Sequence, residues 1–158
     1  MFKTALIVLS DRASAGLYEE KCLPAMRESL GAGYEVVREL LIPDDASALQ
    51  AELIDLADRG AADLILTSGG TGLSPRDVTP QATAAVLDYQ VPGIAEAMRA
   101  AALPAVRNAM LSRAIAGVRH RTLIVNLPGS PKAVAESLGT IAPVLPHALG
   151  QLAGESGH

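Results

Sequence analysis

Short apolar runs alternate along this chain with segments in which apolar residues recur every three or four positions. Thr4 to Leu9 is a continuous apolar run, which is the pattern of a strand buried on both faces. Four later segments also favour strands. The predicted strands are Thr4 to Leu9, Tyr34 to Ile42, Asp63 to Thr67, Ala114 to Val118 and Thr122 to Asn126.

Apolar residues at helical spacing predict helices between these strands. Leu23, Met26 and Leu30, for example, fall on one face of a helix. The segment 103–113 has no clear pattern. We therefore predict helices that carry Leu23 to Leu30, Leu49 to Ala57, Gln81 to Leu87, Gly93 to Ala102, Ala133 to Leu138 and Pro143 to Leu152.

Two of these helices have recognisable start signals. Ser47 with Gln50 predicts a capping box, in which each side chain pairs with the other residue's backbone N–H. Thr79 is expected to cap the next helix, with Pro80 at its first helical position.

This alternation of strands and helices predicts an α/β fold with a mostly parallel sheet covered on both faces. The 158 residues contain no internal repeat or linker and are expected to form a single domain, 1–158, with a frayed tail at 154–158. Since the carboxyl ends of parallel strands lie on one edge, the loops that follow them should meet there. Those loops are Ser10 to Gly16, Pro43 to Asp45, Ser68 to Thr79 and Leu127 to Lys132.

The loop from Ser68 to Thr79 is the most distinctive of the four. Gly69, Gly70 and Gly72 allow positive φ and let a ligand sit close to the main chain. A strand, a glycine turn and a helix together aim backbone N–H groups at an anion, and the helix dipole adds to the attraction. The loop is neither a Walker A sequence nor Gly-x-Gly-x-x-Gly. It favours a phosphate site, with a simple tight turn as the alternative.

Composition narrows the class of protein. Hydrophobic residues make up 49% and charged residues 19%, which is typical of globular proteins. A net charge of -4 and only 3% aromatic residues argue against a nucleic-acid surface. No stretch approaches the roughly 20 apolar residues of a membrane span, and the run after Lys3 is too short for a signal peptide. The single Cys22 excludes an intrachain disulfide and fits a cytoplasmic location.

Five motifs follow one another along the chain: Ser10-Asp11-Arg12-Ala13-Ser14, Ile42-Pro43-Asp44-Asp45, Thr67 through Pro80, Met110-Leu111-Ser112-Arg113 and Asn126-Leu127-Pro128-Gly129-Ser130-Pro131. Together they resemble the Mog/MoaB family, the molybdopterin adenylyltransferases of molybdenum cofactor biosynthesis, whose domain also occurs in gephyrin. The resemblance covers nearly the whole chain. It implies a three-layer α/β/α sandwich, usually trimeric, that transfers AMP from Mg-ATP to the terminal phosphate of molybdopterin and releases pyrophosphate.

The resemblance also implies two essential aspartates, which fall on Asp44 and Asp77. Mg²⁺ prefers one or two carboxylates together with phosphates and waters, so both are the expected magnesium ligands. The attacking phosphate already carries its charge, so the reaction needs positioning and charge neutralisation rather than a general base. Arg76 and Lys132 are candidate cationic partners for phosphate. The residues expected to bind nucleotide or pterin are Ser10, Asp11, Ser68, Gly69, Gly70, Thr71, Gly72, Arg76, Ser112, Asn126, Pro128, Gly129, Ser130 and Lys132.

The expected substrates are molybdopterin and ATP, and the molybdenum-insertion enzyme of the pathway is an expected partner. Other functions stay open: a non-catalytic molybdopterin-binding paralogue, a related phosphoesterase or molybdenum-insertion domain, and a structural scaffold. Individual residues also have simpler interpretations. Asp44 would then only cap a helix, Asp77 would only pair with Arg76 or Arg113, and Ser130 would only begin a helix.

Overall fold

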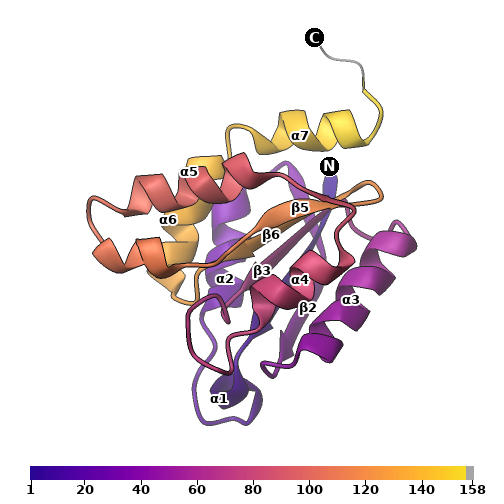
Figure 1. Ribbon diagram of the computed structural model, residues 1–158. Helices are drawn as coiled ribbons and strands as arrows, with labels where there is room; N and C mark the ends of the chain where they lie inside the picture. The colour runs from indigo at the N-terminus through magenta and orange to yellow at the C-terminus, as the bar shows by residue number, and fades with distance from the viewer. Residues whose placement is uncertain (156–158) are drawn as a thin grey trace.

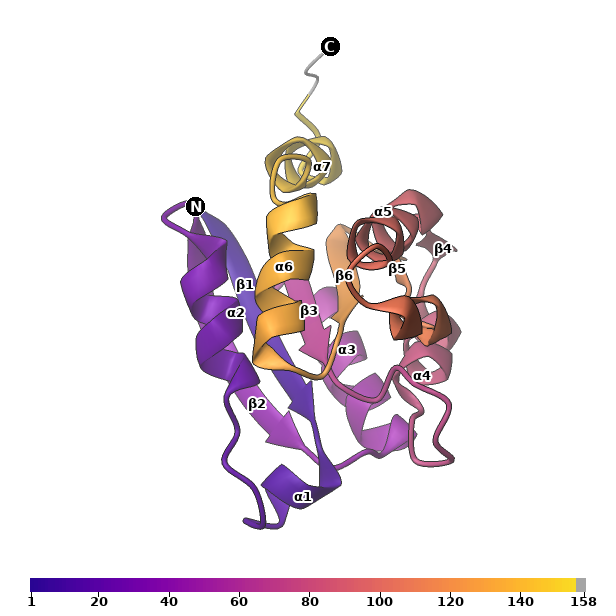
Figure 2. The same ribbon diagram turned by 90° about the vertical axis from the view of Figure 1, so that its left-hand side faces the viewer.

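The computed structural model describes residues 1–155 as a three-layer sandwich, with one sheet between two layers of helices (Figures 1 and 2). The strand order is β2-β1-β3-β6-β5-β4. The four strands from β2 to β6 are parallel, whereas β5 and β4 are antiparallel to their neighbours, so the predicted mostly parallel sheet is confirmed. The strands are β1 (Phe2–Leu9), β2 (Tyr34–Ile42), β3 (Leu64–Ser68), β4 (Tyr89–Gln90), β5 (Ala116–Arg119) and β6 (Thr122–Leu127).

The helices divide between the two faces of this sheet. In Figure 2, α2, α5 and α6 lie in front of the strands, while α3 and α4 lie behind them. A short helix and a 3-10 helix lie in connecting loops. The bounds are α1 (Asp11–Ser14), α2 (Cys22–Leu30), α3 (Ala46–Asp58), α4 (Thr79–Val86), α5 (Pro92–Ala102), the 3-10 helix η1 (Arg107–Leu111), α6 (Pro131–Ile141) and α7 (Leu145–Leu152).

The continuous apolar run of β1 serves both faces. Leu6 and Val8 pack into the cluster formed with α2, α5, α6 and α7, whereas Ala5 and Ile7 pack against α3 and α4. Side chains of a strand alternate between the faces, so a strand covered on both sides must be apolar at every position. The central strands are therefore rigid supports for the loops at their ends.

Two local predictions are wrong. Helix α3 is capped by Asp45 rather than by a Ser47–Gln50 box, because the Asp45 carboxylate accepts hydrogen bonds from Ser47 N (2.9 Å) and Ala48 N (3.2 Å). Thr79 does not cap α4, whose N-cap residue is Val78. The hydroxyl of Thr79 instead donates to the glycine loop, as described below.

Sequence reasoning missed two elements and left one segment unassigned. Strand β4 has only two residues, too few to show a periodic pattern. Helix α1 has four residues and begins at Ser10, whose hydroxyl accepts from Ala13 N. The unassigned segment 103–113 contains the 3-10 helix η1.

The end of the chain is described up to Glu155. Gly154 N and Glu155 N donate to carbonyls of α7, and residues 156–158 lie outside the described part, where the expected fraying stays a prediction. Within residues 1–155, no helix is both long and apolar enough to span a bilayer.

Candidate functional site

The loops that follow β1, β2, β3 and β6 meet at one edge of the sheet, as the sequence predicts for parallel strands (Figure 2). They enclose a cavity of about 230 Å³, which we call the aspartate cavity. Its lining includes both predicted catalytic residues. The lining residues are Val8, Leu9, Ser10, Ala13, Tyr18, Glu20, Cys22, Asp44, Ser68, Gly69, Gly70, Asp77 and Gly129.

A reciprocal pair of hydrogen bonds holds Asp44 in this cavity. Asp11 N donates to Asp44 Oδ2 (3.1 Å), and Asp44 N donates to Asp11 Oδ1 (2.9 Å). Asp44 therefore does not cap α3, the helix that follows Pro43, and that simpler interpretation is wrong; its carboxylate accepts instead from the first residue of α1. Its other oxygen, Oδ1, is buried without a hydrogen-bond partner among the described residues. A buried acceptor without a partner is costly and suggests a ligand that is bound there during function.

The electrostatics of Asp44 favour a cation. Burial raises the pKa of its carboxyl, and the nearby negative charges of Asp11 and Asp77 raise that pKa further, while the hydrogen bond from Asp11 N and the charge of Arg76 oppose the change. The ionised form is therefore under-stabilised by the protein alone. A metal ion at Oδ1 would relieve both the burial and the repulsion.

Arg76 has an exposed side chain that pairs with Asp11. Its Nε donates to Asp11 Oδ2 (2.9 Å) and its terminal nitrogen to Asp11 Oδ1 (3.0 Å). This bidentate pair lowers the pKa of the Asp11 carboxyl, with the Asp44 N–H as a second cause. Asp11 thus stays ionised and keeps its hold on Asp44.

The glycine loop packs so closely against the end of β1 and the start of α4 that side chains are excluded at two positions. Gly69 and Gly70 have φ of 96° and 69°, in the left-handed region that favours glycine. A Cβ at Gly69 would clash with the Leu9 carbonyl oxygen. A Cβ at Gly70 would clash with the Thr79 hydroxyl and lie 3.1 Å from Asp44 Oδ1.

The loop uses its carbonyl oxygens within the protein and leaves N–H groups available. Thr79 donates from its hydroxyl to Gly69 O (2.9 Å) and from its N–H to Gly70 O (3.2 Å). Within residues 1–155, the N–H groups of Gly70, Thr71 and Gly72 have no protein acceptor. Successive unpaired N–H groups at a glycine-rich turn are suited to phosphate oxygens.

Asp77 approaches the same loop from its other end. Asp77 Oδ2 accepts from Ser74 N (3.2 Å), and a Cβ on Gly72 would lie 2.8 Å from that oxygen. The two carboxylates thus lie against the glycine loop at two positions within the same cavity, Asp44 at Gly70 and Asp77 at Gly72. Asp77 pairs through its carboxylate with neither arginine considered from sequence, so that interpretation is wrong.

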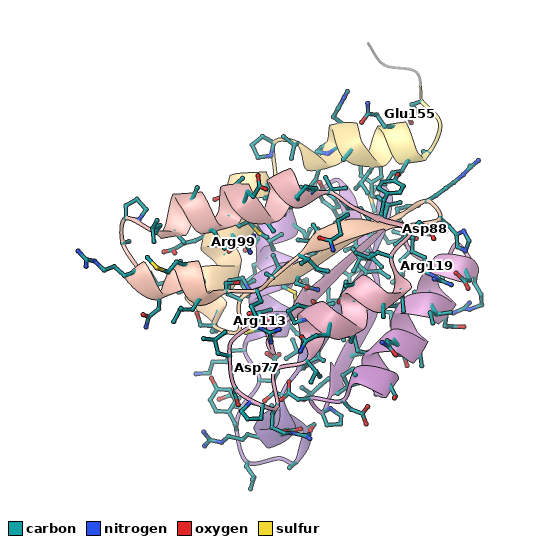
Figure 3. All side chains as sticks on the ribbon, viewed as in Figure 1. Asp77, Asp88, Arg99, Arg113, Arg119 and Glu155 are labelled. Atoms are coloured by element: carbon teal, nitrogen blue, oxygen red, sulfur yellow. The ribbon has the colours of Figure 1, made fainter. Side chains whose placement is uncertain are left out.

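Arg113 is a site residue that the sequence prediction left out. Its guanidinium donates to two loop carbonyls, Gly72 O and Asp77 O, and to Gln81 Oε1 of α4, each at 2.8 Å. Arg113 N also donates to Thr71 O (2.9 Å). Figure 3 shows Arg113 directly above Asp77. In the sequence, Arg113 is marked by its place in the Met-Leu-Ser-Arg motif, but this motif does not show which carbonyl oxygens its guanidinium bonds.

The loop after β6 packs on the glycine loop. Ser68 Oγ donates to Pro128 O (2.7 Å), and a Cβ at Gly129 would lie 3.4 Å from Gly69 Cα. Cys22 Sγ contacts Gly129 O (3.5 Å), and burial raises the pKa of its thiol. Cys22 and Glu20 line the cavity although the prediction did not include them. Both come from the loop and helix that follow β1.

Four predicted binding residues have mainly structural contacts. Asn126 is fully buried, and its amide bonds Thr67, Thr83 and the Ile115 N–H. Ser10 and Ser130 cap helices α1 and α6, so Ser130 does begin a helix, and its role in ligand binding stays a prediction. Lys132 is 88% exposed, with Glu136 at 4.0 Å.

A larger, mostly apolar cavity of about 640 Å³ lies on the other side of the glycine loop, between α5, η1 and α6. Thr71, Gly72 and Leu73 form its wall nearest the aspartates, and Ser112 and Pro128 also line it. Its volume lies within the range of small-molecule pockets, about 300–1,000 Å³. The glycine loop therefore separates a polar cavity with two carboxylates from a larger, mostly apolar cavity.

Comparison with known proteins agrees with this geometry. Residues 5–147 match the family described as "Probable molybdopterin binding domain". The chain is 44% identical over 139 residues to the molybdopterin adenylyltransferase of Escherichia coli K12, with 86% of this chain and 71% of that protein covered. The molybdopterin adenylyltransferase of Helicobacter pylori 26695 is 38% identical over 148 residues, with 92% and 84% covered.

Solved structures agree as well. The molybdopterin biosynthesis enzyme MoaB of Thermus thermophilus has a TM-score of 0.92 and 49% identity, with 98% of each chain covered. The Mog protein of Mycobacterium ulcerans has a TM-score of 0.90 and 42% identity, with 96% of this chain and 99% of that chain covered. Fold, motifs and these matches lead to one conclusion: the chain belongs to the molybdopterin-binding domain family of the Mog and MoaB proteins.

Proposed function

We propose that this chain is a molybdopterin adenylyltransferase, which transfers AMP from ATP to the terminal phosphate of molybdopterin and releases pyrophosphate. One observation carries the proposal: two carboxylates, Asp44 and Asp77, lie against either end of a glycine loop that keeps unpaired N–H groups. The names of the relatives, carried over to this chain, supply the two substrates.

The proposed reaction is one in-line displacement at the α-phosphorus of ATP. An oxygen of the molybdopterin phosphate forms the new P–O bond, the bond to the bridging α,β-oxygen breaks, and pyrophosphate leaves with that electron pair. The nucleophile is already anionic, so the protein must hold crowded negative charges in line rather than remove a proton. The N–H groups of Gly70, Thr71 and Gly72 are suited to the phosphate oxygens.

Asp44 and Asp77 are the residues that would hold Mg²⁺. Among residues 1–155, no group of three or more His, Cys, Asp or Glu side chains is placed to bind a metal ion. A pair of carboxylates nevertheless fits Mg²⁺, which completes its shell with substrate phosphates and waters. The unpartnered Asp44 Oδ1 and the raised pKa of that carboxyl support this assignment. Bound there, the ion would neutralise charge on the reacting phosphates.

The rings of the substrates suit the apolar cavity, which reaches the glycine loop at Thr71 and Gly72. Arg76 and Lys132 remain proposed phosphate partners. To bind phosphate, the Arg76 guanidinium would have to exchange its hydrogen bonds to the Asp11 carboxylate for bonds to phosphate oxygens. Lys132, being exposed, would act as a point charge at the entrance.

We further propose a homotrimer that works in the cytoplasm and passes its product to the molybdenum-insertion enzyme. Leu73, Val106, Met110 and Leu111 are between 47% and 66% exposed, beside or within the wall of the apolar cavity. Apolar surface of this kind is typical of association between copies. The free thiol of Cys22 fits a reducing compartment.

The test is release of pyrophosphate from ATP by the purified protein with and without molybdopterin. We expect release, and formation of adenylylated molybdopterin, only when molybdopterin and Mg²⁺ are both present. Pterin binding without pyrophosphate release would contradict the proposal and would favour a non-catalytic binding protein of the same fold.

A further inference from the structure

We propose that Arg113 is a positioning residue for AMP transfer, which fixes the Asp77 half of the glycine loop from a distant part of the chain. The inference rests on the proposed function for its catalytic readout. Its structural basis is independent of that function. Arg113 touches neither carboxylate, so it acts through the main chain of the loop.

The contacts of Arg113 connect the beginning and the end of the loop. Its N–H bonds Thr71 O, its Nε bonds Gly72 O and one terminal nitrogen bonds Asp77 O. The other terminal nitrogen bonds Gln81 in the first turn of α4. One side chain therefore sets the distance between the N–H groups at 71–72, the carboxylate at 77 and the helix that follows.

Asp77 needs this support more than Asp44 does. Asp44 is held by two hydrogen bonds to Asp11: its carboxylate accepts from Asp11 N, and its own N–H donates to the Asp11 carboxylate. Arg76 in turn holds the Asp11 carboxylate. The only hydrogen bond to the Asp77 carboxylate among the described residues comes from Ser74 N, at 3.2 Å and within the same loop. The orientation of that carboxylate thus depends on where the main chain of the loop lies. Asp77 N donates locally to Ser74 O, and the bond from Arg113 to Asp77 O ties this main chain to a distant part of the protein.

A guanidinium is required for this arrangement. Its planar fork presents several N–H groups in fixed directions and can satisfy three separated acceptors at once. A lysine ammonium would keep the positive charge but cannot reach Gly72, Asp77 and Gln81 with the same geometry. Charge and positioning are therefore separable by the change Arg113→Lys.

The first experiment measures steady-state AMP transfer by the wild-type protein, Arg113→Lys and Arg113→Met. We expect kcat to fall by roughly 10²-fold in both variants, since a misplacement of about 1 Å has that effect. We expect KM for ATP and for molybdopterin to change far less. The Mg²⁺ concentration that gives half the maximal rate should rise, because Asp77 is displaced. A merely structural role would lower the melting temperature without this pattern.

Arg121→Lys is the matched control. Arg121 is exposed in the β5–β6 turn, at the opposite end of β6 from the site loops. Arg121→Lys removes the same chemical group, a guanidinium, as Arg113→Lys does. Because Arg121 lies far from the site loops, its substitution should leave kcat, KM and Mg²⁺ dependence unchanged. Wild-type kcat and Mg²⁺ dependence in Arg113→Lys would overturn the inference.

The second experiment follows amide hydrogen exchange and needs no turnover. Exchange of the hydrogen-bonded amides of Ser74, Asp77 and Thr79 should accelerate in both Arg113 variants, whereas exchange in α7 should stay as in the wild type. Unchanged exchange of these three amides would overturn the positioning role even in an active enzyme. If the wild-type protein transferred no AMP, the proposed function and the catalytic part of this inference would fail, while the exchange would still decide whether Arg113 orders the loop.

Discussion

Replacing the two site aspartates separates chemistry from stability. The variants are Asp44→Asn, Asp77→Asn and the double variant, each of which removes a negative charge while keeping the shape of the side chain. If the carboxylates hold Mg²⁺ on the reacting phosphates, their charge matters most in the transition state. Turnover should then fall more than pterin affinity does.

The structure sets the size of each effect. An asparagine at Asp44 can still accept the bond from Asp11 N, and the lost Oδ1 charge has no hydrogen-bond partner among the described residues. Folding should therefore lose nothing, and removal of a buried charge near Asp11 and Asp77 should raise stability at neutral pH. In contrast, loss of electrostatic stabilisation worth about 3–4 kcal/mol would lower kcat by roughly 10²–10³-fold.

The assay combines melting temperature, molybdopterin affinity and AMP transfer. In a domain of this size, about 1 kcal/mol corresponds to a shift of roughly 2–4 °C, so the expected gain or neutrality at Asp44 is measurable. The double variant should be scarcely slower than the slower single variant, because residues that act through one metal are non-additive. Near-normal AMP transfer in both single variants would refute the metal-holding role.

Four further predictions concern the glycine loop, the Asp44 carboxyl and the association of copies. Gly70→Val should abolish ATP binding, because a side chain there clashes with Thr79 and the left-handed φ of 69° disfavours valine; unchanged affinity in a folded variant would reduce the loop to a turn. The raised pKa of Asp44 means that its ionised form is lost as pH falls through a value above that of an ordinary aspartate, so the acid limb of kcat/KM should lie at higher pH than for a solvated carboxyl. Because the folded state raises the pKa of Asp44, the protonated carboxyl stabilises the folded protein. This contribution to the free energy of unfolding is complete below the unfolded pKa and is lost as pH rises through the folded pKa. Asp44→Asn should remove this dependence from a plot of melting temperature against pH. Met110→Glu should shift the light-scattering mass toward the 16.3 kDa monomer, and a wild-type protein that already has this mass at micromolar concentration would contradict the trimer.

The sequence alone determined the framework of this protein. Ala5 to Leu9 of β1 are all apolar because a central parallel strand is buried on both faces, so strand and fold class could be predicted together. The meeting of four loops followed from the same geometry, since parallel strands end at one edge. The glycine loop was recognisable because only glycine readily tolerates the conformations at positions 69 and 70.

Tertiary structure decided which partner each charged residue takes. Asp11 bonds Asp44 across 33 residues and Arg76 across 65, although Arg76 stands next to Asp77 in the sequence. Arg113 reaches acceptors 36 and 41 residues away. These partners follow from the register and spacing of neighbouring strands, which bring loop atoms within about 3 Å of one another, and hydrogen bonds depend on such distances rather than on separation along the chain.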